Sequence, residues 1–140
     1  MICDLCPRRC GALRTEVRGL GRCRMPELPV LARAALHRWE EPPISGTRGS
    51  GTIFFSGCSL GCVFCQNRKI SRREAEGQNI TVDALAKTFL SLEKKGAHNI
   101  NLVTSAHYVP QIIEALQIAR KQGLSLPIVY NSSGYEQVET

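Results

Sequence analysis

The positions of the cysteines constrain this chain more than any other feature of its sequence. All seven lie within the first 65 of 140 residues, and Cys58, Cys62 and Cys65 fall within eight consecutive positions. An odd number of cysteines does not form a closed disulfide framework. The amino terminus lacks the apolar stretch of a secretory signal, which predicts a cytoplasmic protein, and disulfides rarely persist in the cytoplasm. We therefore expect the cysteines to bind metal.

From residue 51 onward the sequence alternates between strand and helix patterns. Residues 52–55, 99–103 and 127–130 are short apolar runs typical of buried strands. Between them, residues 81–96 and 109–123 carry apolar side chains at helical spacing, and each range ends on a glycine. Strands separated by helices predict right-handed βαβ units and a parallel sheet. The expected fold class is α/β, with about three βα units.

The first 50 residues follow a different pattern. Residues 1–25 are rich in Cys, Arg and Gly, and residues 26–50 contain four prolines around a short stretch at 30–39. We expect irregular structure here. The sequence thus predicts two parts, a Cys-rich metal-binding extension over residues 1–50 and an α/β domain over residues 51–140.

In a parallel sheet, ligands bind at the carboxyl ends of the strands. The loops expected at those ends are residues 56–69, 104–108 and 131–136, and the three clustered cysteines lie in the first of them. Gly57 and Gly61 beside them allow the backbone to approach a metal centre closely. Zinc in a structural site is held by four protein ligands, and an electron-transfer cubane by four cysteines. Three thiolates instead leave one iron of a [4Fe–4S] cluster open.

Four further cysteines form a second candidate site near the amino terminus. Cys3, Cys6, Cys10 and Cys23 supply enough thiolates for a tetrahedral zinc or for an auxiliary iron–sulfur cluster. Spacing does not choose between these metals, and free thiols are the third alternative.

The motifs together resemble a known family. The Cys58-x3-Cys62-x2-Cys65 spacing, with Phe64 before the last cysteine, resembles the radical S-adenosylmethionine (SAM) signature. The surrounding sequence is similar to iron–sulfur proteins related to pyruvate formate-lyase activating enzymes. This similarity includes CDLCPRRCG at residues 3–11, WEEPPISG at 39–46 and GTIFFSGC at 51–58.

The resemblance implies a partial TIM-type (β/α) barrel with a [4Fe–4S] cluster on Cys58, Cys62 and Cys65. In that superfamily the open iron binds SAM, and an electron from a donor such as flavodoxin or ferredoxin cleaves SAM to methionine and a 5′-deoxyadenosyl radical. The resemblance places Phe64 near the adenine. It also implies a glycyl radical enzyme as a partner, whereas the substrate is not predicted.

Two departures from the family pattern stand out. A Gly-Gly-Glu-Pro-like element that contacts the SAM amine is replaced by VTSAH at residues 103–107, so Thr104 is the candidate cofactor contact there. Asn131 and Ser132 follow the third strand, where related enzymes have polar cofactor-binding residues. The chain also contains about half of the expected βα units, which predicts either a truncated and inactive fragment or a chain whose remaining strands come from elsewhere.

Two other functions fit the same residues. One is a non-enzymatic electron carrier in which a residue such as His107 completes the cluster, and the other is a zinc-binding interaction module. The module would use the basic half of the chain, since residues 1–73 carry a net charge of +8 and residues 74–140 of −2. Scattered arginines without interleaved aromatics do not favour nucleic-acid binding. No apolar run approaches the ~20 residues of a membrane helix.

Overall fold

The computed structural model describes residues 1–72 and 76–140. In chain order, the elements are β1 (Ile2–Cys3), β2 (Ala12–Leu13), β3 (Val30–His37), α1 (Pro42–Ser45), β4 (Ser50–Phe55), α2 (Arg68–Ser71), β5 (Gln78–Asn79), α3 (Val82–Lys94), β6 (Ile100–Val103), the 3₁₀ helix η1 (Ala106–Tyr108), α4 (Val109–Lys121) and β7 (Ile128–Asn131). No helix within these ranges is both long and apolar enough to cross a bilayer.

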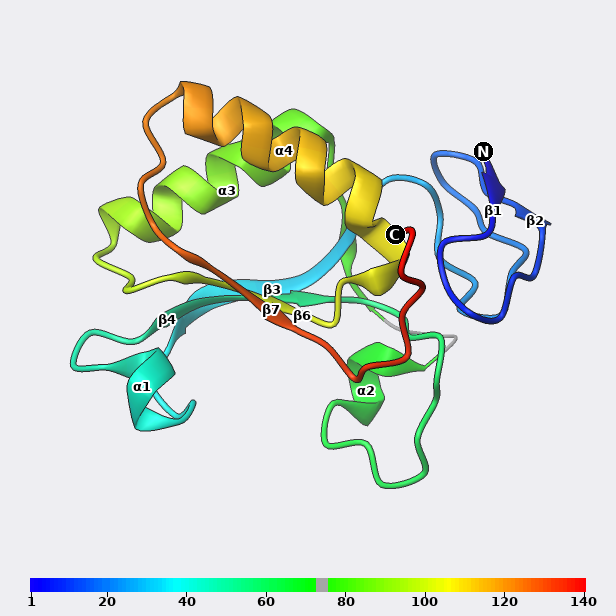
Figure 1. Cartoon of the computed structure of the whole chain (residues 1–140), viewed down its shortest axis with the longest axis horizontal. Helices are drawn as coiled ribbons and strands as arrows, with labels where there is room; N and C mark the ends of the chain where they lie inside the picture. Colours follow the sequence, from blue (N-terminus) through cyan, green and yellow to red (C-terminus); the bar gives the residue numbers. More distant parts are fainter. Residues whose placement is uncertain (73–75) are drawn as a thin grey trace.

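The described strands form a small β1–β2 ladder and a five-stranded mixed sheet of order β5-β3-β4-β6-β7. Strands β4, β6 and β7 pair in parallel, as the strand and helix pattern predicted. Helices α3 and α4 cover one face of the sheet, and α1 and α2 lie on the other (Figure 1). The α/β class is therefore confirmed. Closure into a barrel remains a prediction.

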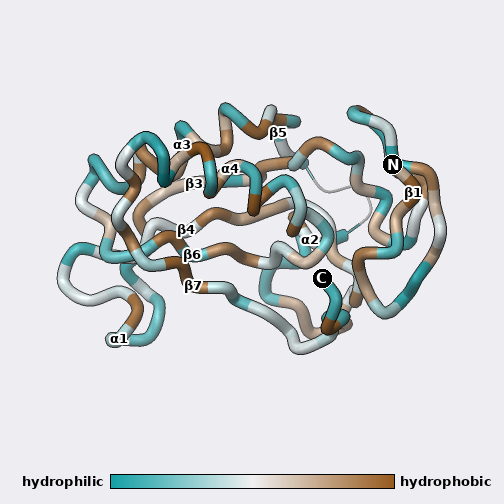
Figure 2. Tube along the Cα trace, turned by 45° about the horizontal axis from the view of Figure 1, so that its top comes forward, coloured by the Kyte–Doolittle hydropathy of each residue, from teal (hydrophilic) through white to brown (hydrophobic). Residues whose placement is uncertain are grey.

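The core lies between the sheet and the helix pair α3 and α4, and the strands that form its floor are apolar along their centres (Figure 2). On α3 the buried side chains recur at helical spacing: Leu85, Ala86, Phe89 and Leu92. Helix α3 begins where expected, because the Thr81 hydroxyl accepts a hydrogen bond from the Ala84 amide at 3.2 Å. It ends at Lys94, and Gly96, just after the C-cap residue Lys95, has a φ of +86°.

Strand β3 differs from the prediction of irregular structure. It pairs antiparallel with β4 from Leu31 opposite Phe55 to His37 opposite Ser50, with a register shift between Leu31 and Arg33. The sheet therefore crosses the predicted boundary at residue 50, which itself lies within β4. Because the pairing is antiparallel, the residues before β3 lie beside the residues after β4. This arrangement brings the amino-terminal cysteines towards the cysteine loop, which we define as residues 56–67.

Candidate metal and cofactor site

The cysteine loop leaves the carboxyl end of β4 and returns to it through α2. The Gly57 amide donates a hydrogen bond to the Ile70 carbonyl at 2.7 Å, which closes the loop at its base. Gly57 and Gly61 have φ values of +81° and +72°, a region that other residues rarely adopt. A Cβ atom at Gly57 would lie 2.2 Å from Cγ of Met25. Glycine is therefore required here by both conformation and packing.

Polar groups of the loop and of α2 surround the three thiols. The Leu60 amide approaches the sulfur of Cys58 at 3.5 Å, and the Ser71 hydroxyl approaches the sulfur of Cys65 at 3.4 Å. Arg72 donates to the carbonyls of Gly61 and Cys62 at 3.0 and 2.9 Å. Hydrogen bonds to the sulfurs are one of the factors that set the reduction potential of a cluster. The pattern of the cysteines gave no sign of Ser71 or Arg72.

Cys58, Cys62 and Cys65 are all half-buried and free. In the part of the chain that the structure describes, no three His, Cys, Asp or Glu side chains are grouped closely enough to hold a metal ion. The three thiols of the loop are therefore not arranged around a common point in this conformation. Phe64 is 84% exposed, and its contact with an adenine stays a prediction.

The strand register brings the predicted cofactor residues to the same edge as the cysteine loop. Phe54 lies opposite Val103, which lies opposite Asn131, so the carboxyl ends of β4, β6 and β7 are level. Thr104 follows β6 and is half-buried, whereas Asn131 and Ser132 are exposed. The Ser132 hydroxyl donates to a carboxylate oxygen of Glu136 at 2.8 Å, which leaves Asn131 the freer of the two polar groups.

His107 has a structural role in this conformation. It is 4% exposed, and its Nε2 atom lies 2.8 Å from the Ser56 carbonyl. Burial lowers the pKa of His107 to about 4, so the ring is neutral at neutral pH. The contact joins the segment after β6 to the base of the cysteine loop. It engages one of the two ring nitrogens that the electron-carrier hypothesis could use for metal binding.

The amino-terminal cysteines lie in and around the β1–β2 ladder. Cys3 is buried, Cys6 and Cys23 are half-buried, and Cys10 is exposed. The sulfur of Cys10 lies 4.0 Å from the Cys3 carbonyl and 2.9 Å from the position of a Cβ on Gly21. Burial raises the pKa of the Cys23 thiol. Cys3 and Cys10 are close enough to Cys23 to affect its pKa, although no three of the described cysteines are arranged to hold a metal ion.

This region lies against the cysteine loop. Arg8 donates through Nε to the Ser59 carbonyl. A small cavity of about 40 Å³ is lined by Cys23 from the amino-terminal group and Cys58 from the loop, together with Arg22, Gly61, Ser71 and Arg72. One cysteine of each group, predicted to belong to separate sites, therefore lines the same cavity.

These observations define an α/β protein with a thiol-rich loop at the carboxyl edge of its parallel strands. A family model for the radical SAM superfamily matches residues 52–137. The match covers more than half of the chain and includes all three cysteines of the loop, so the chain belongs to the radical SAM superfamily.

A comparison with curated proteins gives one further similarity. Over 142 aligned residues the chain is 30% identical to the uncharacterized protein MJ0674 of Methanocaldococcus jannaschii. The alignment covers 98% of this chain and 40% of that protein, so the chain spans less than half of the relative's length. No solved structure matches the chain.

Proposed function

We propose that the chain carries the [4Fe–4S] and SAM-binding part of a radical SAM enzyme of the activating-enzyme type. The observation that carries this proposal is the position of Cys58, Cys62 and Cys65 on one loop, at the strand edge where βα proteins bind ligands. Superfamily membership implies both cofactors.

The residues present fit such a cluster. The donor set is three thiols on a loop whose glycines adopt positive φ, with an amide and a hydroxyl directed at two of the sulfurs. Cys58, Cys62 and Cys65 would be the protein ligands, and the Ser71 hydroxyl would donate a hydrogen bond to the Cys65 sulfur. Arg72 fixes the backbone of the loop through the carbonyls of Gly61 and Cys62.

When bound, the cluster supplies the electron that cleaves SAM to methionine and a 5′-deoxyadenosyl radical. The protein binds and orients SAM and excludes water from it. Thr104, Asn131 and Ser132 are the polar groups at the correct edge, and Phe64 is the aromatic group on the loop. Closing Phe64 over SAM would bury a ring that is now largely exposed, which favours the cofactor-bound state.

The partners form part of the same proposal. The electron donor is a reduced flavodoxin or ferredoxin, and the acceptor of the radical is a glycyl radical enzyme. All seven cysteines are free, which suits a reducing compartment such as the cytoplasm. Because the chain spans 40% of its relative, turnover by this chain alone is not part of the proposal, whereas SAM binding at the cluster is.

The test is anaerobic reconstitution with iron and sulfide, followed by reduction and addition of SAM. We expect a cluster whose EPR spectrum changes when SAM is added, because SAM occupies the open iron. Cys62→Ala should remove this response, and Ser91→Ala, which changes an exposed side chain on α3, should retain it. A cluster whose spectrum ignores SAM would support the electron carrier, and zinc without iron would support the interaction module. Either result contradicts the proposal.

A further inference from the structure

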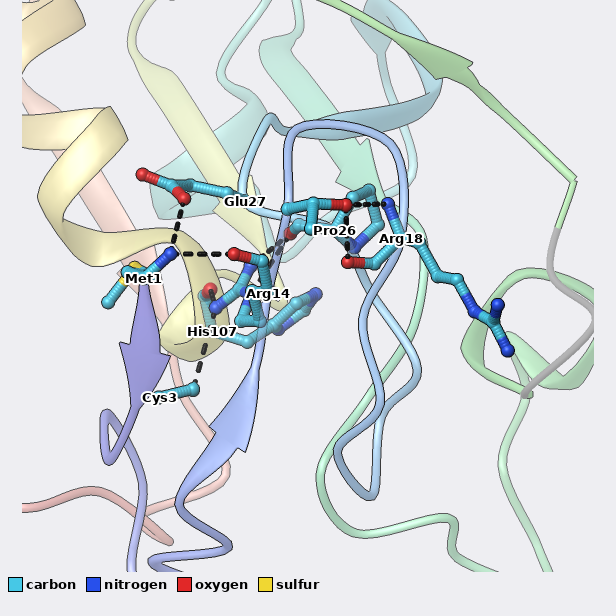
Figure 3. Close-up of polar contacts among 8 residues, drawn as sticks. Met1, Cys3, Arg14, Arg18, Pro26, Glu27 and His107 are labelled. Atoms are coloured by element: carbon cyan, nitrogen blue, oxygen red, sulfur yellow. Dashed lines mark hydrogen bonds and ion pairs between the residues drawn. The ribbon is translucent and has the colours of Figure 1, made fainter.

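Arg14 is a buried cation in the amino-terminal segment. Its side chain is 1% exposed, and all its hydrogen-bond partners are backbone carbonyls or a thiol (Figure 3). Nε donates to the Pro26 carbonyl at 3.1 Å, and Nη1 donates to the His107 carbonyl at 2.7 Å. The guanidinium also lies over the Tyr108 ring, 5.2 Å from its centroid. The guanidinium is thus fully buried among neutral groups.

No carboxylate of residues 1–72 or 76–140 forms an ion pair with Arg14. The single ion pair within the described ranges joins the Met1 amino group to Glu27 at 2.8 Å, and Arg14 takes no part in it. Burying a charge without a counter-charge costs several kcal/mol even after relaxation. The stacking on Tyr108 offsets only part of that cost, since a desolvated cation–π contact contributes about 2 kcal/mol. The neutral groups around Arg14 therefore lack the negative charge that would balance its guanidinium.

One partner of Arg14 can carry the missing negative charge. Nη1 lies 3.7 Å from the sulfur of Cys3, and the sulfur of Cys10 lies 4.0 Å from the Cys3 carbonyl. A free thiol is neutral at pH 7, but cysteines bound to a metal are thiolates. Four thiolates around a divalent zinc leave a net charge of −2, and a cubane held by four thiolates is also anionic.

We propose that Cys3, Cys6, Cys10 and Cys23 hold an anionic tetrathiolate metal centre and that Arg14 is its buried counter-charge. The cysteine spacing left zinc, an iron–sulfur cluster and free thiols open. A bound metal makes the cysteines anionic and free thiols do not, so the buried charge of Arg14 favours a bound metal. The shared chemistry is tetrathiolate coordination. Both zinc and an iron–sulfur cluster can be held by four thiolates, and the metal content of the purified chain distinguishes them.

Arg14 also positions this centre against the rest of the protein. The same guanidinium that contacts Cys3 binds the carbonyl of His107, whose ring contacts the Ser56 carbonyl at the base of the cysteine loop. This chain of contacts runs from the amino-terminal thiols to the residue that precedes Gly57. Arg14 is thus a positioning residue that fixes a second metal centre beside the cavity shared by Cys23 and Cys58.

The first experiment uses the full chain with Cys58→Ala, Cys62→Ala and Cys65→Ala, which removes the proposed SAM cluster and leaves the amino-terminal thiols. We expect one metal centre per chain after anaerobic purification: zinc alone, or iron with sulfide. Replacing the metal by Co²⁺ should give the near-ultraviolet thiolate-to-cobalt band of a tetrathiolate site. A triple variant that binds neither metal and shows no such band overturns the inference. The proposed SAM chemistry is tested separately by the intact loop, so the two can fail independently.

The second experiment separates the charge of Arg14 from its hydrogen bonds. In the triple variant, Arg14→Gln keeps hydrogen-bond donors and loses the charge, whereas Arg14→Lys keeps the charge and loses the planar fork. We expect Arg14→Gln to weaken Co²⁺ binding about tenfold or more, as loss of outer-sphere partners does elsewhere, and Arg14→Lys to stay within about threefold. Arg18→Gln is the matched control, because the exposed Arg18 side chain points away from these contacts (Figure 3). Equal Co²⁺ affinity in Arg14→Gln and Arg18→Gln, or a larger loss in Arg14→Lys than in Arg14→Gln, overturns the role of the charge.

Discussion

Replacing Gly57 by alanine tests how the base of the cysteine loop is built. Gly57 has a φ of +81°, and an L-residue in the left-handed region costs about 1–2 kcal/mol. The new Cβ would also lie 2.2 Å from Cγ and 2.7 Å from Sδ of the buried Met25. Adding a methyl group to a packed core costs roughly 1–3 kcal/mol. We therefore expect Gly57→Ala to lower the free energy of unfolding by about 2–5 kcal/mol, a large part of the ~5–15 kcal/mol typical of a domain.

Comparison with Gly134→Ala separates the backbone cost of Gly57→Ala from its packing cost. Gly134 has a similar φ of +75°, but a Cβ there meets no atom within 4 Å, so only the backbone cost of about 1–2 kcal/mol applies. Urea denaturation of the metal-free chain, followed by circular dichroism, measures both variants. The difference between them reports the contact with Met25, and a Met25→Ala change should abolish that difference. If Gly57→Ala and Gly134→Ala destabilise equally, the packing of the amino-terminal segment on the loop is refuted.

Three further predictions concern single groups. Thr81→Ala removes the acceptor for the Ala84 amide and should cost about 1 kcal/mol in urea denaturation, with Thr81→Ser close to the wild type. Burial lowers the pKa of His107 to about 4, so the unfolded chain binds more protons between pH 6.5 and 4. In the metal-free chain this group should therefore reduce stability by ~1.4 kcal/mol for each pH unit that the pH falls in that window, and His107→Gln should reduce the slope. Ser71→Ala removes the hydroxyl near the Cys65 sulfur and should shift the cluster midpoint in a redox titration to a more negative potential, whereas Ser71→Thr should not; an unchanged midpoint in Ser71→Ala would contradict a hydrogen bond to that sulfur.

The parts of the fold that depend on local signals were predictable. Helix α3 follows from the cap at Thr81, the spacing of its apolar residues and the glycine at 96, all within one short window. The parallel pairing of β4, β6 and β7 follows from the chirality of βαβ units. The position of the cysteine loop at the carboxyl edge follows in turn, because this edge is common to all three strands.

Strand β3 was not predictable in the same way. Three of its eight residues are alanine, which packs poorly in a strand, and prolines at 29 and 42 lie on either side of it. What stabilises β3 is its antiparallel pairing with β4, a contact that no local pattern reports. Arg14 is a similar case. It is one of several arginines in a basic segment, and only the folded chain shows that this one is buried.

The direction of the β3–β4 pairing explains why the two groups of cysteines meet. Leu31 near the start of β3 lies opposite Phe55 at the end of β4, and the Ser56 amide donates to the Val30 carbonyl at 2.9 Å. The chain just before β3 is therefore held beside the chain just after β4. A parallel β3 would have entered at the opposite end of β4, six residues away, which is roughly 20 Å at ~3.3 Å per residue. The orientation of one strand, rather than the spacing of the cysteines, thus places Cys23 and Cys58 at the same cavity.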